Sequence, residues 1–146
     1  MKKEFQRDQR NINLNLPESY LAKGYFDKNG NLFEEFITKW AEEIAKKLGL
    51  SIPDMKKHQL RRFYNHVKSL ERRLSLSSYE NINKDLKMLV SYATSAAYTT
   101  PPKIPKLFEE FIRKNMELVK DSKTFRAFIN HFEAIVGFSE KYLKKN

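Results

Sequence analysis

The sequence predicts an all-α protein, a compact bundle of about five helices with a flexible N-terminal arm. Apolar residues recur three and four positions apart in five long stretches, whereas the alternation typical of strands is nearly absent. Proline, glycine and asparagine fall between these stretches. The 146 residues, 40% of them hydrophobic, suit one domain with its own core. We therefore assign residues 1–19 to the arm and residues 20–146 to a single helical-bundle domain.

The arm and the first helix are separated by a turn. Residues 1–19 are polar, rich in asparagine and weakly periodic, which favours a mobile segment. The stretch GYFDKNGN at 24–31 has turn chemistry, with an Asn-Gly pair as the break. The first helix is predicted to begin near Leu32 and to end at Gly49, because glycine commonly stops a helix.

A proline and a polar loop delimit the next two helices. Pro53 marks the boundary before a second helix at 54–74. The stretch SLSSYEN at 75–81 is predicted to be a loop, and a third helix follows at 82–97. The stretch TTPPKIP at 99–105 is the strongest helix breaker in the chain, and we interpret it as a rigid turn between helices.

The last two helices are rich in phenylalanine. The fourth is predicted to begin near Lys106 and is interrupted at Asp121 and Ser122; the fifth covers about 123–143. Their phenylalanines, like Trp40 in the first helix, sit at core spacing. We therefore expect these aromatic residues to form the hydrophobic core rather than a ligand site.

The sequence favours no enzymatic chemistry. It contains no cysteine, which excludes disulfides, thiolate metal sites and a cysteine nucleophile and favours a cytoplasmic location. No apolar run reaches the roughly 20 residues of a membrane span. Because the chain lacks phosphate-binding glycine motifs and metal-ligand spacing, we predict no catalytic residue, metal, cofactor or small-molecule ligand. An acid/base pair assembled across helices stays open, with Glu133 the carboxylate in the most apolar setting.

The net charge is concentrated in the second helix. The chain carries +10, and residues 55–74 hold seven basic residues and one acidic residue, a balance of +6. At about 100° per residue, the cations flank an apolar stripe and Asn65 lies just beyond them. Such a row can follow a sugar-phosphate backbone, while Asn65 can reach a 2′-hydroxyl or a base edge. The candidate nucleic-acid-binding residues are Lys57, Arg61, Arg62, Asn65, Lys68, Arg72 and Arg73.

Charge alone leaves an equal alternative, a solvated helix face that keeps the protein soluble. Two further sets of residues are similarly open. The cations that would extend the basic surface, or are simply solvated, are Lys84, Lys87 and Arg126. Small residues on the side of the fifth helix away from its phenylalanines suit contact with another subunit, or simple surface tolerance. They are Ala127, Ala134 and Gly137.

Four stretches resemble a known family in their order and spacing. They are GYFDKNGNLFEEFI at 24–37, QLRRFYNHVKSLE at 59–71, LVSYATSAAY at 89–98 and FRAFINHFEAIVGF at 125–138. Together they are similar to the small subunit of the type III-A CRISPR effector, the Csm complex. The resemblance covers nearly everything after Tyr20.

The resemblance implies a non-catalytic helical subunit that stacks in several copies to line the channel holding the guide RNA/target RNA duplex. Its implied partners are that duplex, other copies of itself, and the backbone and large subunits, to which the catalytic activities belong. The implied contacts follow the RNA backbone independently of sequence. Arg61 and Arg62 match the family's basic pair, and Lys68 matches its VK lysine. Where the family often has a basic residue, Tyr98 stands here, so RNA contacts from the third helix are not expected.

Two alternatives to an RNA-channel subunit are open. One is a helical protein-protein interaction module that scaffolds the complex and has no direct RNA role. The other is a helix-turn-helix DNA binder, which the loop at 75–81 disfavours because it lacks a short glycine turn. The RNA hypothesis expects the cations of the second helix to face outward without carboxylates from other helices capping them.

Overall fold

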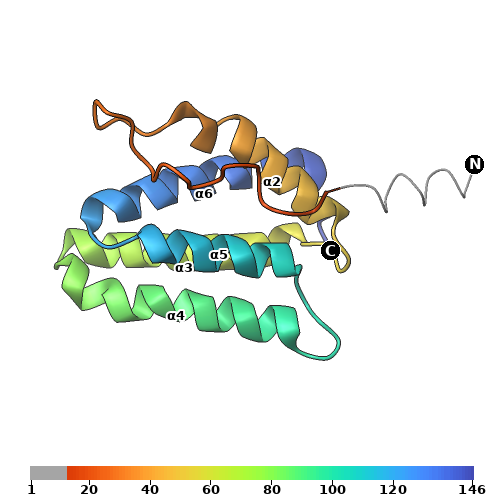
Figure 1. Cartoon of the computed structure of the whole chain (residues 1–146). Helices are drawn as coiled ribbons and strands as arrows, with labels where there is room; N and C mark the ends of the chain where they lie inside the picture. Colours follow the sequence, from red (N-terminus) through yellow and green to blue (C-terminus); the bar gives the residue numbers. More distant parts are fainter. Residues whose placement is uncertain (1–12) are drawn as a thin grey trace, which may run out of the picture.

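The computed structural model describes residues 13–146 and confirms an all-α fold (Figure 1). Within these residues there are five α-helices and a short 3₁₀ turn but no strand, only isolated bridges. The part of the predicted arm at residues 1–12 lies outside the described residues. The elements are η1 (Glu34–Phe36), α2 (Lys39–Leu50), α3 (Lys57–Ser75), α4 (Tyr79–Tyr98), α5 (Lys106–Leu118) and α6 (Ser122–Tyr142).

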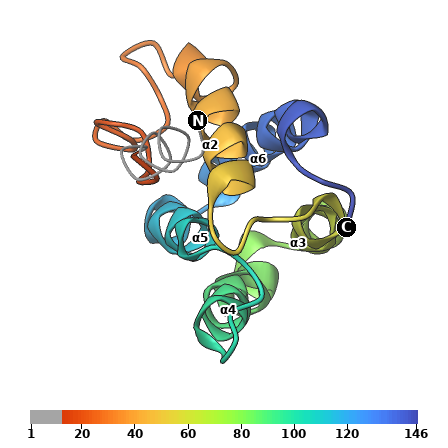
Figure 2. The same ribbon diagram turned by 90° about the vertical axis from the view of Figure 1, so that its right-hand side faces the viewer.

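The helices pack in three layers, which the end view shows most clearly (Figure 2). Helix α2 packs along α6 in one layer, and α3 and α5 lie beneath them. Helix α4 packs against both α3 and α5 and forms the opposite outer layer. Helix α3 therefore lies at an edge of the bundle, between α6 on one flank and α4 on the other.

Residues 13–19 lie against the bundle, although the sequence assigned them to the arm. Leu16 packs against the core and Pro17 is buried. The ammonium of Lys47 donates a hydrogen bond of 2.8 Å to the backbone carbonyl of Asn15. Leu16 and Pro17, together with the hydrogen bond to Asn15, thus hold this largely polar segment against the bundle.

The first helix differs from its prediction at both ends. A 3₁₀ turn occupies part of the predicted start, and α2 itself begins at Lys39. Gly49 does not stop the helix, which continues to Leu50. A Cβ atom at Gly49 would lie 2.4 Å from the backbone oxygen of Tyr142, closer than atoms approach without displacement. Glycine is required here because the end of α6 crosses α2 closely, not because the helix ends.

The loop between α3 and α4 is shorter than predicted. Helix α4 begins at Tyr79, which is buried and donates a hydrogen bond of 2.9 Å to Asn83, while its hydroxyl lies 3.4 Å from the carbonyl oxygen of Val119. Burial of this tyrosine extends the helix into the stretch predicted to be loop. The breaker at 99–105 is confirmed, since no helix covers it and α5 begins at Lys106.

The phenylalanines of α5 and α6 lie in the core or pack against it, as their spacing predicts. Trp40 packs edge-on against Phe36, with ring centroids 4.9 Å apart, and is partly buried. The rings of α5 and α6 meet in tilted and edge-to-face pairs, the arrangements that aromatic quadrupoles favour. The fully buried phenylalanines are Phe36, Phe108, Phe111, Phe125, Phe128 and Phe132.

A chain of buried hydrogen bonds ties the segment before α2 to α5 and α6. Asn115 accepts a bond of 2.6 Å from the Tyr25 hydroxyl and donates one of 2.9 Å to the Tyr20 oxygen. The Tyr20 oxygen lies 2.6 Å from Nε2 of His131, whose Nδ1 lies 2.5 Å from the carbonyl of Phe36. With Tyr20 donating to Nε2, a neutral imidazole donates from Nδ1. Burial lowers the pKa of His131 to about 4, which keeps the ring neutral.

The N-terminus of α6 is capped by Asp121, whose side chain accepts a hydrogen bond of 2.8 Å from the backbone of Thr124. That bond lowers the pKa of the carboxyl group below its usual value. We expect Asp121→Ala to lower the free energy of unfolding by about 1 kcal/mol, because it leaves a helix-end donor without its partner. Urea denaturation at neutral pH measures the change. Asp121→Asn keeps a hydrogen-bond acceptor and should lower the free energy of unfolding much less. Equal decreases in the two variants would contradict the capping role.

Candidate nucleic-acid interface

Helix α3 is fixed in place by its apolar stripe. Leu60, Val67, Leu70 and Leu74 are buried, at helical spacing. The half-buried Phe63 packs on Phe108 and Tyr64 on Phe132, so both aromatic rings contact the core. The opposite side of the helix is therefore held toward solvent.

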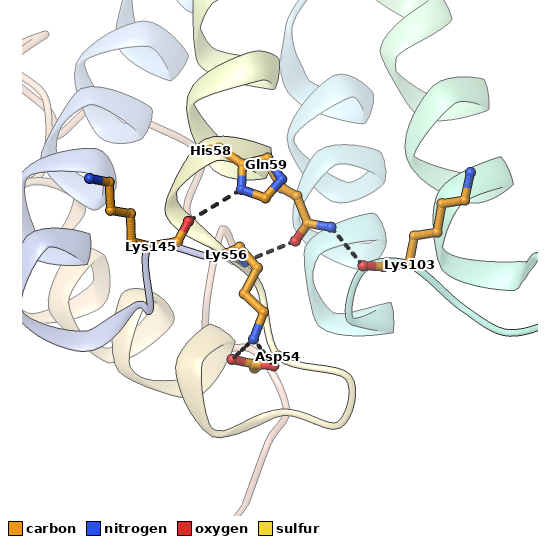
Figure 3. Close-up of polar contacts among 6 residues, drawn as sticks. All are labelled: Asp54, Lys56, His58, Gln59, Lys103 and Lys145. Carbon is orange, nitrogen blue, oxygen red and sulfur yellow. Dashed lines mark hydrogen bonds and ion pairs between the residues drawn. The ribbon is translucent and has the colours of Figure 1, made fainter.

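The N-terminal end of α3 is anchored to several segments that are distant in sequence (Figure 3). Gln59 accepts a hydrogen bond of 2.9 Å from the backbone of Lys56 and donates one of 2.9 Å to the carbonyl of Lys103. His58 lies 3.3 Å from the carbonyl of Lys145, and the Lys56 ammonium binds Asp54 at 2.9 Å. The C-terminal residues and the turn at 99–105 thus contact this end of the basic helix and help to fix its position.

On the flank facing α6, two of the predicted cations are already paired. The carboxylate of Glu140 binds the ammonium of Lys57 at 3.1 Å and the guanidinium of Arg61. Hydrogen bonds from Arg61 and Lys57 hold the pKa of Glu140 below its ordinary value, so this carboxylate stays charged. Glu140 could not be identified from the sequence, because nothing local marks a residue 79 positions away from Arg61 as its partner.

The remaining cations divide into paired and unpaired groups. Lys68 binds Glu71 of its own helix at 2.6 Å, and Arg73 binds Asp85 of α4 at 2.6 Å. Within residues 13–146, no ion pair includes Arg62 or Arg72, and both are exposed. The expectation that no carboxylate from another helix caps these cations is thus corrected. Lys57, Arg61 and Arg73 each bind a carboxylate of α6 or α4.

The outermost strip of α3 is the part most open to a ligand. Arg62, Asn65 and Arg72 are exposed, and in the described part of the chain none of their three side chains makes a hydrogen bond. The paired cations flank this strip and are also largely at the surface. Surface ion pairs contribute little free energy and are screened by salt, so their cations can exchange partners.

The three possible extensions of the basic surface differ in their environment. Lys84 and Arg126 are exposed. The ammonium of Lys87 instead donates to the carbonyls of Met116 and Val119 at the end of α5, and burial lowers its pKa. Lys87 therefore caps α5 rather than extending the basic surface.

The small residues of α6 do not form one exposed patch. Ala127 is buried at 4% exposure, Ala134 is half-buried, and Gly137 is exposed with open space around its Cβ position. The buried arc of α6 is wider than its phenylalanine stripe because α2, α3 and η1 all pack against this helix. The predicted contact at Ala127 is corrected for this reason, since the residue faces the core.

The candidate acid/base carboxylate, Glu133, lies at the surface of α6. Glu133 is exposed and accepts a hydrogen bond of 3.0 Å from the Tyr64 hydroxyl, while His131 of the same helix is enclosed in the core. In residues 13–146 no cluster of three or more histidines and carboxylates has the arrangement of a metal site. None of the helices described is both long and apolar enough to cross a bilayer.

A family model described as Csm2 Type III-A matches residues 33–145, a stretch that begins just before η1 and includes every helix of the bundle. No curated protein and no solved structure matches the chain.

Proposed function

The chain belongs to the Csm2 type III-A family, and from this premise we propose that it contacts the backbone of the guide RNA/target RNA duplex through the outer face of α3. Membership makes it a small subunit of the type III-A Csm complex, which assembles with other subunits. We further propose that several copies line the RNA channel beside the backbone and large subunits, without catalytic activity and in the cytoplasm.

One observation supports the RNA contact most directly. The outer strip of α3 presents Arg62 and Arg72 as exposed guanidinium groups without ion pairs in residues 13–146, with Asn65 between them. Guanidinium groups bind phosphate oxygens through two parallel hydrogen bonds, and neither arginine would have to leave a carboxylate to do so. Contacts of this kind read the backbone and carry no sequence information.

The test removes these two charges from the assembled complex. We expect Arg62→Gln with Arg72→Gln to weaken RNA binding similarly for all sequences and to reduce the slope of log affinity against log salt by roughly 0.7–0.9 per lost contact. Binding is measured by fluorescence anisotropy with RNA of two unrelated sequences over a series of salt concentrations.

The matched control removes two charges elsewhere. The double variant Lys114→Gln with Lys120→Gln lowers the net charge by the same amount. Lys114 belongs to α5 and Lys120 follows its end, and α5 lies on the other side of the bundle from α3 (Figure 2). This control should leave the salt slope nearly unchanged. Equal effects of the two double variants would mean that net charge, and not a binding surface, sets the affinity.

The ion pairs between helices favour a second candidate, a helical interaction module that scaffolds the complex with no direct RNA role. Glu140 joins α6 to α3, and Asp85 joins α4 to α3, so part of the basic set contributes to the fold. Unchanged RNA binding by the Arg62 and Arg72 variant, in complexes of normal subunit composition, would favour this candidate.

A further inference from the structure

Glu140 differs from the other surface carboxylates around α3 because it binds two cations at once. One oxygen, Oε1, accepts from the guanidinium of Arg61, and the other, Oε2, accepts from the ammonium of Lys57 at 3.1 Å. The two cations lie four residues apart, one helical turn, on the same flank of α3. Glu71 and Asp85, by contrast, each bind one cation of α3.

The arrangement around Glu140 suits a phosphodiester as well as a carboxylate. A phosphodiester carries one negative charge and two oxygens that accept hydrogen bonds, and arginine with a neighbouring lysine is a common way to bind them. A phosphate in place of the carboxylate would meet the same two donors. The position also lies on the α6 flank of the outer strip that holds Arg62 and Arg72.

The Glu140 contacts are open enough to exchange. The side chains of Glu140 and Arg61 are 53% and 51% exposed, and that of Lys57 is 26% exposed. Ion pairs with this exposure are weak and are screened by salt. Both cations can therefore leave the carboxylate when another anion arrives, unlike Lys87, which is held by two backbone carbonyls.

We propose that Glu140 occupies a phosphate position of the RNA-binding face and competes with the RNA backbone for Lys57 and Arg61. The inference rests on the proposed function and adds a regulatory element to it. A single chain then binds RNA weakly, because its carboxylate must be displaced first. Several copies in one assembly overcome this competition, since linked contacts raise the effective concentration of each.

The test is the Glu140→Gln variant of the full-length chain, with a labelled RNA duplex of arbitrary sequence as the probe. We expect its RNA affinity to rise about threefold to tenfold and its salt slope to steepen by roughly 0.7–0.9, the contribution of one additional phosphate contact. Fluorescence anisotropy over about 50–200 mM salt covers the range in which such contacts change affinity most.

The control is Glu117→Gln on α5. Glu117 is exposed and also contacts an arginine, Arg113, at 4.0 Å, so the variant makes the same charge change away from α3. We expect it to raise RNA affinity by less than about twofold, the effect of net charge at a distance. A second control tests Glu140→Gln in a protein that already carries Lys57→Gln and Arg61→Gln. In this background the added Glu140→Gln substitution should raise RNA affinity no more than Glu117→Gln does in the wild type.

Three results would overturn the inference. The first is that Glu140→Gln raises RNA affinity no more than Glu117→Gln does. The second is that Glu140→Gln raises RNA affinity just as much when Lys57 and Arg61 have been replaced. The third is that neither the wild type nor the Glu140→Gln variant binds RNA detectably at the lowest salt concentration. If the Arg62 and Arg72 variant still weakens binding in the complex, the proposed function stands without this regulation. If that variant has no effect, both proposals fall.

Discussion

Replacing Gly49 with alanine is expected to destabilise the protein by about 3 kcal/mol, the upper part of the range for adding a methyl group to a packed site. Its Cβ would lie 2.4 Å from the oxygen and 3.3 Å from the carbonyl carbon of Tyr142. Both atoms belong to the backbone of the last residue of α6, so the contact cannot be relieved by a change of rotamer. The helix ends must move apart, which also disturbs the packing of Leu143 beside them.

Gly137→Ala is the matched control for this prediction. Gly137 is also helical, but nothing lies within 4 Å of its Cβ position. Alanine there should raise the free energy of unfolding by about 0.5–1 kcal/mol, because it restricts the unfolded chain. Urea denaturation at neutral pH measures both variants. A Gly49→Ala protein as stable as wild type would show that α2 and α6 do not approach closely.

Lowering the pH from about 6.5 to about 4 is expected to remove about 3 kcal/mol of stability through His131 alone, since each pKa unit corresponds to about 1.4 kcal/mol. Burial lowers the pKa of this ring from 6.5 to about 4 in the folded state. Between these values the unfolded chain binds a proton that the folded chain does not. Acid therefore favours unfolding in this window, and the contribution is fully present only above the ordinary histidine pKa.

The variant His131→Gln separates this contribution from the rest of the protein. It should be less stable than wild type at neutral pH, because it alters the hydrogen bonds to Tyr20 and to the carbonyl of Phe36. Its stability should change much less between about pH 6.5 and pH 4.5, where the lost histidine no longer titrates. Urea denaturation at several pH values in this range gives the free energy of unfolding of both proteins. If this free energy falls equally in the two proteins as the pH is lowered, the loss of stability does not come from His131.

The number and approximate positions of the helices follow from the sequence. Apolar spacing predicted five helices, and the proline-rich stretch at 99–105 predicted the break before α5. The prediction succeeds because apolar residues spaced three and four apart fall on one face of a helix, and that face must be buried. The ends of the elements were less predictable, since burial of Tyr79 and the close crossing at Gly49 depend on other helices.

The sequence by itself determined an all-helical chain with one strongly basic helix, and residues that place it in its family. Only the tertiary structure decided which basic residues of α3 form ion pairs with other helices, and that Ala127 lies in the core. The physical reason is that the partners come from distant parts of the chain. Glu140 is 79 residues from Arg61, and Asp85 belongs to the next helix after Arg73. Helical periodicity fixes the direction of a side chain from its own helix, whereas its ion pairs depend on how the helices pack.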